Sequence, residues 1–221
     1  MVFTITPITT TDYPKHLACL LWFAKCNMRC RYCYNTALVE GEGRLTIDDV
    51  ERFLRKRVGK LDGVVFSGGE CTESKDFIPL VRKAKELGYK VKVDTNGSNL
   101  DKLKEVIDDV DYLAMDFKAT KSKFKSVTNR KLYDKFIESL KYLIEIGKEF
   151  EVRTTIHIDL IDEEDINQMC RVLEGCGYKG TYYLQKYVGI GDTIGGLKDP
   201  SREFNKSKIK TNIKIEYRNF N

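Results

Sequence analysis

Six short apolar or alternating runs, each followed by a stretch of helical length, limit the folds that this 221-residue chain can adopt. The connections between them are short, and alternation of this kind favours a parallel sheet with right-handed crossovers. The sequence therefore predicts an α/β fold. The runs are strands predicted at about 17–23, 63–67, 90–94, 112–117, 151–157 and 181–185.

Helix signals lie between these runs. Thr46 opens one amphipathic stretch with a capping-box-like sequence and the stretch continues to about residue 58. Asp162 can cap another that runs toward Glu174. Gly88 and Gly147 stand where C-terminal caps belong.

Side-chain alternation indicates how the sheet is curved. On the fifth predicted strand Arg153 and His157 share one face, while Val152 and Ile156 share the other. A dry sandwich would not tolerate the polar face without partners. A partial (β/α)6 TIM-like barrel of parallel strands, with a polar lumen, satisfies both faces.

Two regions are expected along the chain. Residues 1–189 should form the barrel domain, and residues 190–221 a C-terminal extension packed on it or flanking it. The extension is Gly-rich and then Lys-rich, with an alternating run at 209–217. It could be a late strand, a flap or a partly disordered arm.

Composition excludes several classes of protein. Hydrophobic residues make up 42% and charged residues 32%, as in soluble globular proteins. The longest apolar run, 17–24, is far shorter than the roughly 20 residues of a spanning helix. It lacks a signal-peptide cleavage site, so we expect a cytoplasmic protein with no membrane or nucleic-acid partner. The net charge is +5, and the basic segments 118–131 and 198–218 are either solvated surface or a rim that meets an acidic partner.

Three of the seven cysteines form a C-x3-C-x2-C triplet, Cys26, Cys30 and Cys33, just after the first predicted strand. An odd, clustered set is a poor disulfide framework. Three thiolates can hold three irons of a 4Fe–4S cube and leave the fourth iron open to a small molecule. The alternatives are a zinc site, which normally needs a fourth ligand, or three unrelated buried thiols.

Three further polar motifs follow the next predicted strands. Gly68–Glu70 follows the second, Asp94–Asn96 the third, and Asp116–Lys118 stands at the end of the fourth. Ligands and catalytic groups converge at the carboxyl ends of the strands in parallel α/β folds. We therefore expect a ligand pocket opposite the cysteine triplet.

The order and spacing of these motifs resemble the radical S-adenosylmethionine (SAM) superfamily. Within it the chain resembles the activating proteins of anaerobic ribonucleoside-triphosphate reductase and, more distantly, pyruvate formate-lyase activating enzyme. The resemblance covers about residues 9–187. It rests on Asp12-Tyr13-Pro14, the triplet followed by Tyr34-Asn35, Ser67-Gly68-Gly69-Glu70, Asp94-Thr95-Asn96-Gly97, Met115-Asp116-Phe117-Lys118 and Arg153-Thr154-Thr155.

The resemblance implies a role for each motif. Cys26, Cys30 and Cys33 would ligate the cluster, whose open iron chelates SAM. Tyr32 corresponds to an aromatic near the adenine, and Gly68, Gly69 and Glu70 line the methionine amino group. The remaining positions match residues near the cofactor, the acidic ones also near a monovalent cation in relatives: Asp94, Asn96, Asp116, Lys118 and Arg153.

The resemblance also implies an activity. A low-potential donor such as flavodoxin or ferredoxin reduces the cluster, SAM is cleaved, and the resulting 5′-deoxyadenosyl radical removes a hydrogen atom from a glycine of a partner glycyl radical enzyme. Anaerobic ribonucleoside-triphosphate reductase is the expected partner. One alternative is a small-molecule radical enzyme resembling 7-carboxy-7-deazaguanine synthase. The other is a non-catalytic iron–sulfur or zinc-binding protein.

Two positions depart from the family pattern. Cys71 stands where relatives often have proline, and Tyr34 where they often have histidine. Cys71 could lie close to the cluster and compete for the open iron. Cys170 and Cys176 are expected to be structural thiols.

Overall fold

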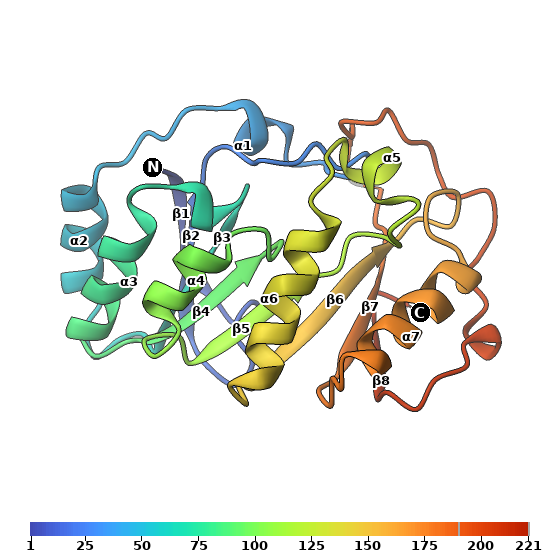
Figure 1. Cartoon of the computed structure of the whole chain (residues 1–221). Coiled ribbons are helices and arrows are strands. Elements are labelled where there is room, and N and C mark those ends of the chain that lie inside the picture. The colour runs from blue at the N-terminus through green and yellow to red at the C-terminus, as the bar shows by residue number, and fades with distance from the viewer. Residues whose placement is uncertain (190, 221) are drawn as a thin grey trace. The chain divides into compact units, whose positions relative to one another are not determined.

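A computed structural model describes residues 1–189 and 191–220 (Figure 1). The chain forms two compact units. The first unit comprises Met1–Asn27, Asn35–Thr95 and Asn99–Ala114. The second comprises Met28–Tyr34, Asn96–Ser98 and Met115–Asn221.

The sheet of the first unit contains β1 (Val2–Thr9), β2 (Ala18–Phe23), β3 (Gly63–Gly68) and β4 (Lys90–Thr95). β1 is antiparallel to β2, and β2, β3 and β4 are parallel, with Leu21 opposite Phe66 and Phe66 opposite Val93. β5 (Tyr112–Asp116) starts in this unit and ends in the second. All six predicted strands are present within one residue of their predicted ends.

β1 was not predicted from the sequence. Pro7 interrupts its alternating pattern, and proline cannot donate a hydrogen bond to a sheet ladder. The structure accommodates it because the register of β1 against β2 shifts between Thr6 and Thr9, so this stretch escapes regular pairing.

Most helices of the first unit lie along its sheet, and the first of them lies beyond the ends of the strands (Figure 1). They are α1 (Thr36–Glu40), α2 (Ile47–Arg55), α3 (Phe77–Glu86) and α4 (Leu100–Val106), with a 3-10 turn at Cys71–Glu73. The predicted capping box is present at Thr46, whose hydroxyl accepts from the Asp49 N–H, although α2 ends at Arg55 instead of near residue 58. α3 packs on the sheet through Phe77, whose ring meets Phe66 edge to face at 6.0 Å.

The second unit carries β6 (Phe150–Ile156), β7 (Tyr182–Lys186) and β8 (Ile215–Arg218), all parallel. Its helices are α5 (Phe124–Thr128), α6 (Tyr133–Glu145) and α7 (Glu163–Gly175), and a 3-10 turn spans Lys206–Lys208. Phe117 stacks on Phe136 of α6 at 4.6 Å. The sequence left three alternatives for the C-terminal extension, and β8 shows that part of it is a late strand. The domain boundary at residue 189 stays a prediction.

The two faces of β6 differ as predicted. Val152 and Ile156 are buried on one face, and Arg153 is only partly covered on the other. The polar face is nevertheless well packed, because Glu151 and His157 are 3% and 2% exposed. His157 is hydrogen-bonded, with Nε2 at 2.9 Å from the Lys198 carbonyl.

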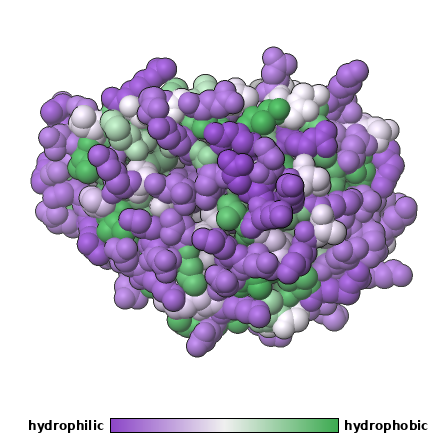
Figure 2. Space-filling model, turned by 45° about the horizontal axis from the view of Figure 1, so that its top comes forward, coloured by the Kyte–Doolittle hydropathy of each residue, from purple (hydrophilic) through white to green (hydrophobic). Residues whose placement is uncertain are grey.

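The surface view in Figure 2 is mostly hydrophilic with small, separate hydrophobic areas. Ile8, Val58 and Ile146 are exposed, and single exposed apolar side chains are common on protein surfaces. Among the helices of the described residues, none combines the length and the apolar character needed to cross a membrane.

The N-terminus of α7 yields a stability prediction. The Asp162 side chain accepts the Asp165 N–H at 3.0 Å in a full capping box. Asp162→Ala should lower the free energy of unfolding by about 1 kcal/mol, because a helix donor loses its partner. The control is Glu164→Ala on the same helix, which breaks an exposed pair with Arg171 and leaves the capping box in place, and should cost less than about 0.5 kcal/mol. Urea unfolding measures both, and equal losses would contradict the capping role.

Candidate functional site

The cysteine triplet lies in the loop that follows β2, with Cys26 in the first unit and Cys30 and Cys33 in the second. None of the seven cysteines forms a disulfide. Within residues 1–189 and 191–220, no three His, Cys, Asp or Glu side chains are grouped as ligands of a single ion. Zinc would require such convergence. Three thiolates leave zinc one ligand short, whereas they can hold three irons of a 4Fe–4S cube and leave the fourth open.

Backbone hydrogen bonds hold the second half of this loop from two sides. The N–H groups of Arg29 and Arg31 donate to the carbonyls of Thr128 and Val127 at the end of α5, at 2.8 and 2.9 Å. From the C-terminal extension, the N–H of Ile194 donates to the Cys33 carbonyl at 2.9 Å.

Gly195 adds a further contact to the loop. The hydrogen bonds from Ile194 and Gly195, together with those to Val127 and Thr128, are called the clamp below. The Gly195 N–H donates to the Arg31 carbonyl at 2.9 Å, and a Cβ built on Gly195 would lie 2.6 Å from the Arg31 Cβ. Only glycine allows so close an approach. The sequence did not indicate that the extension contacts the cysteine loop.

Tyr32 lies beside Cys30 in the second unit. Its side chain is 7% exposed, and its hydroxyl has no hydrogen bond of normal geometry within the described residues. The Lys118 ammonium is 5.9 Å from the Tyr32 ring. Burial raises the pKa of the Cys30 thiol, and the Lys118 charge lowers it in part. A buried polar atom without a partner indicates a site where a polar ligand would supply one.

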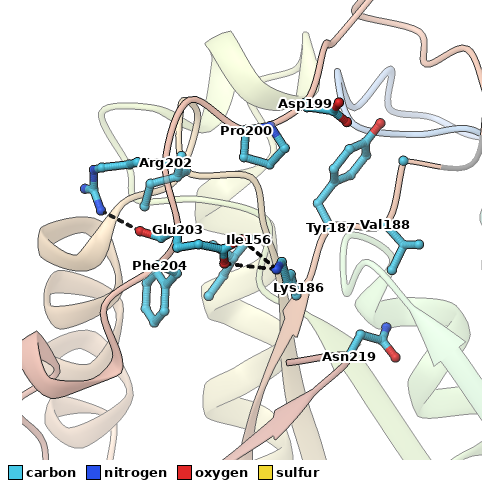
Figure 3. Close-up of a pocket in the computed structure, with 12 residues that line it drawn as sticks. Ile156, Lys186, Tyr187, Val188, Asp199, Pro200, Arg202, Glu203, Phe204 and Asn219 are labelled. Atoms are coloured by element: carbon cyan, nitrogen blue, oxygen red, sulfur yellow. Dashed lines mark hydrogen bonds and ion pairs between the residues drawn. The ribbon is translucent and has the colours of Figure 1, made fainter. Parts of the chain in front are cut away.

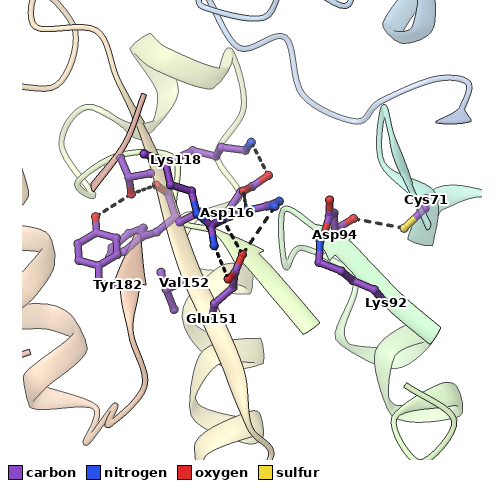
Figure 4. A network of polar contacts seen from close by, with 12 residues as sticks. Cys71, Lys92, Asp94, Asp116, Lys118, Glu151, Val152 and Tyr182 are labelled. Atoms are coloured by element: carbon purple, nitrogen blue, oxygen red, sulfur yellow. Dashed lines mark hydrogen bonds and ion pairs between the residues drawn. The ribbon is translucent and has the colours of Figure 1, made fainter. Parts of the chain in front are cut away.

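Asp116 at the end of β5, Lys118 just after it and Arg153 in the middle of β6 form an ionic cluster (Figure 4). Asp116 Oδ1 accepts from Arg153 Nε at 2.9 Å, and Oδ2 accepts from Lys118 Nζ at 3.0 Å. Burial alone would raise the pKa of Asp116, but the charges and hydrogen bonds of Arg153 and Lys118 outweigh it and hold this pKa at about 2. The carboxylate is therefore ionised at any physiological pH.

Gly68 and Gly69 fix the start of the cysteine loop in the first unit. The Gly69 N–H donates to the Phe23 carbonyl, and the Glu70 N–H to the Lys25 carbonyl, both at 2.9 Å. A Cβ on Gly69 would lie 1.9 Å from the Lys25 oxygen, and Gly68 has a φ of +117°. The sequence interpretation assigned these glycines to ligand approach. The structure shows that the chain itself needs them next to Cys26.

Glu70 is buried and anchored. It is 2% exposed, and Oε1 accepts from the hydroxyls of Thr72 and Thr95 at 2.7 Å each. Thr95 ends β4, so this carboxylate ties the Gly68–Glu70 segment to the neighbouring strand. Such a fixed carboxylate can accept a hydrogen bond from a ligand ammonium without reorganising.

Cys71 and Asp94 lie in contact in the first unit (Figure 4). Cys71 Sγ donates to the Asp94 carbonyl at 3.4 Å, and the Asp94 carboxylate pairs with Lys92. Burial, then the charges of Glu70 and Asp94, raise the pKa of Cys71. The thiol is fully buried and is already engaged with a backbone carbonyl, which disfavours competition of Cys71 for the open iron.

Asn96 belongs to the second unit, where its side chain closes a local turn. Its Oδ1 accepts from the Ser98 N–H at 3.0 Å, and the residue is 4% exposed. The structure thus groups Tyr32, Asp116, Lys118 and Arg153 in one unit, and Glu70 with Asp94 in the other.

An open pocket of about 560 Å³ lies in the second unit at the carboxyl ends of β6 and β7 (Figure 3). Ile156 and Lys186, the last residues of these strands, line one side, and Phe204 lines another. Lys186 Nζ pairs with both carboxylate oxygens of Glu203 at 3.0 and 2.9 Å. The pocket has the size of a ligand site, and no sequence motif had indicated it.

The cysteine loop, the fixed carboxylates and the parallel strands can be compared with known proteins. The radical SAM superfamily profile matches residues 20–174. The chain belongs to the radical SAM superfamily. The superfamily implies that the protein is an enzyme whose cofactors are SAM and a 4Fe–4S cluster, as expected from the sequence.

Two curated relatives of this radical SAM protein differ in their names. One, from Methanocaldococcus jannaschii, is named as a candidate glycyl-radical enzyme activating enzyme; it is 32% identical over 196 residues, which cover 85% of this chain and 80% of the relative. Another, from Saccharolobus islandicus, is named as a GTP 3′,8-cyclase, with 26% identity over 87% of this chain and 64% of its own length.

Solved structures confirm the fold class. SuiB from Streptococcus suis bound to S-adenosylmethionine has a TM-score of 0.69 and 16% identity, over 90% of this chain and 51% of SuiB. A domain of pyruvate-formate lyase-activating enzyme from Bacteroides vulgatus has a TM-score of 0.52 and 16% identity, over 70% of this chain and 98% of that domain. The α/β partial barrel of mostly parallel strands is thus confirmed.

Gly195 allows a test of the clamp on the cysteine loop. Gly195→Ala places a methyl group against Arg31 and should lower the free energy of unfolding by about 1–3 kcal/mol. Iron bound after anaerobic reconstitution should fall with it, because the loop carries Cys30 and Cys33. Gly175→Ala is the control, since its Cβ meets nothing within 4 Å. Unchanged iron content in Gly195→Ala would contradict the clamp.

Asp116 allows a test by pH. Its pKa in the folded chain, about 2, lies below the usual value near 4, so its stabilising contribution is complete above about pH 5 and disappears as pH falls toward 2. The unfolding free energy of the wild type minus that of Asp116→Asn should therefore shrink by about 1–2 kcal/mol between pH 5 and pH 2. Urea unfolding across this range measures it, and a constant or growing difference would contradict the paired carboxylate.

Proposed function

We propose that this protein cleaves SAM reductively at a 4Fe–4S cluster and generates a glycyl radical on a partner enzyme. Anaerobic ribonucleoside-triphosphate reductase is the partner that we favour. The similarity to the Methanocaldococcus jannaschii protein carries this proposal, because it extends over most of both chains. A low-potential flavodoxin or ferredoxin would donate the electron, and a reducing cytoplasm suits seven cysteines without a disulfide.

Cys26, Cys30 and Cys33 would hold the cluster. Together, cluster and SAM supply a one-electron bond cleavage that enables removal of a hydrogen atom from carbon. The protein residues then bind and orient SAM. The clamp on the loop supports this assignment, because a fixed backbone positions Cys30 and Cys33 for the cluster.

The charged side chains of the site would each bind a different group of SAM. Glu70, anchored by two threonine hydroxyls, would accept hydrogen bonds from the SAM ammonium. Asp116, held ionised, would accept from hydroxyl groups, while Lys118 and Arg153 would attract the SAM carboxylate. Tyr32 would gain a partner for its buried hydroxyl. The other members of the proposed site are Gly68, Gly69, Asp94 and Asn96.

The proposed site contains no monovalent cation. Asp94 is already paired with Lys92, and Asp116 with both Lys118 and Arg153. A cation at either carboxylate would have to displace a side chain of the protein that already neutralises it.

The pocket at the ends of β6 and β7 offers a surface for a segment of the partner enzyme. Ile156 and Phe204 are apolar, whereas Lys186 and Glu203 are paired across the pocket. An extended peptide needs both kinds of contact, apolar ones for side chains and polar ones for its backbone.

Anaerobic reconstitution tests the proposed function. With a reductant and SAM, the wild type should release 5′-deoxyadenosine, and adding the purified reductase should give a glycyl radical signal in electron paramagnetic resonance. Cys30→Ala should lose cluster and product, because only two thiolates of the triplet remain. Cys71→Ala, the matched cysteine control, should keep both, because that thiol is buried and donates to the Asp94 carbonyl.

The outcomes separate the alternatives. Release of 5′-deoxyadenosine with GTP or another small substrate, and no radical on the reductase or on pyruvate formate-lyase, would replace activation by small-molecule chemistry. No 5′-deoxyadenosine under any condition would overturn the radical mechanism for this protein.

A further inference from the structure

Glu151 is a buried carboxylate that the proposed mechanism does not use. It lies in β6, is 3% exposed, and points to the same face as Arg153, two residues further on. A buried carboxylate is costly unless it is paired with a cation or well hydrogen-bonded. Its partner therefore has to be present whenever the unit is folded.

One partner comes from β8. Arg218, at the end of β8, donates from Nη1 to Glu151 Oε1 at 3.1 Å and from Nη2 to Oε2 at 2.9 Å. Its guanidinium also stacks on the Tyr183 ring of β7, with Cζ 3.6 Å from the ring centroid. A bidentate, stacked arginine holds one orientation, which lysine cannot reproduce.

Glu151 also lies near the ionic cluster. Arg153 Nη1 is 3.9 Å from Glu151 Oε1, whereas Arg153 Nε donates to Asp116 at 2.9 Å. Opposite charges thus alternate across the sheet face in the order Lys118, Asp116, Arg153, Glu151 and Arg218 (Figure 4). Arg153 is placed between two carboxylates, and it bonds closely to only one of these two.

We propose that Arg218 is a positioning residue for SAM binding, which acts by engaging Glu151 so that Arg153 stays directed to Asp116. The proposal rests on the assignment of Asp116 and Arg153 to the SAM site under the proposed function. When Arg218 is removed, Glu151 loses two hydrogen bonds and attracts Arg153 more strongly. Asp116 then loses its shortest contact with that guanidinium, and Lys118 must neutralise it with less help.

Arg218→Gln tests this on the reconstituted holoenzyme. SAM affinity, measured by anaerobic calorimetric titration, should weaken about 3- to 30-fold, the range of a residue that acts through a network. KM for SAM should rise in the same proportion, while kcat at saturating SAM stays unchanged. Arg218→Lys, which keeps the charge but not the two-pronged contact, should fall between the wild type and Arg218→Gln.

A second substitution separates positioning from mere support. In Glu151→Gln/Arg218→Gln the carboxylate that attracts Arg153 is gone, so SAM affinity should return to within about twofold of the Glu151→Gln variant alone. Lys214→Gln is the matched control, because Lys214 lies in the same segment and pairs only with the half-exposed Glu216 among the ion pairs of the described chain. It should bind SAM like the wild type.

Two results would overturn the inference. One is unchanged SAM affinity in Arg218→Gln; the other is a double variant that binds as weakly as Arg218→Gln. Asp116→Asn distinguishes the failures. If this variant binds SAM normally, the assignment of Asp116 to the site is wrong. If it binds weakly while Arg218→Gln is normal, only the role of Arg218 is wrong.

Discussion

The close approach of the Gly69 backbone to the Lys25 carbonyl is the contact on which the candidate site depends. It leaves no room for a Cβ, and the neighbouring Glu70 N–H donates to the same carbonyl. Two glycines therefore join the end of β3 to the residue just before Cys26. Glu70, the next residue, is then anchored to Thr95 of β4. One motif thus determines where the cysteine loop begins and where a buried carboxylate lies.

Charge is organised by pairing in the second unit. Asp116 is buried enough for its own desolvation to oppose ionisation, yet two cations keep it charged. Glu151 depends in the same way on Arg218. A row of this kind has few alternative arrangements, because each charge has an oppositely charged neighbour and Arg218 is also stacked on a ring. The charged side chains on the polar face of the sheet therefore adopt one defined arrangement.

Much of this could be predicted from the sequence, because the signals are local. Period-two runs marked six strands, and Thr46 and Asp162 marked helix starts through hydrogen bonds to residues three positions away. The contacts of Ile194 and Gly195 with the cysteine loop have no such signal. They join distant parts of the chain through backbone groups, which every residue type except proline carries alike. The Arg218–Glu151 pair was missed for a related reason, since many charges could have paired.

The clamp from the C-terminal extension has a consequence for how the protein is made. Ile194 and Gly195 are synthesised long after Cys33 and Arg31, to which they bond. During translation, the cysteine loop therefore leaves the ribosome well before the segment that completes its hydrogen bonds. Iron–sulfur assembly on this loop has to wait until residues 194 and 195 have been made, or proceed on a loop that lacks these two hydrogen bonds. Truncation before residue 194, by an early stop or by proteolysis, would remove both hydrogen bonds and weaken a cluster site that lies far away in the sequence.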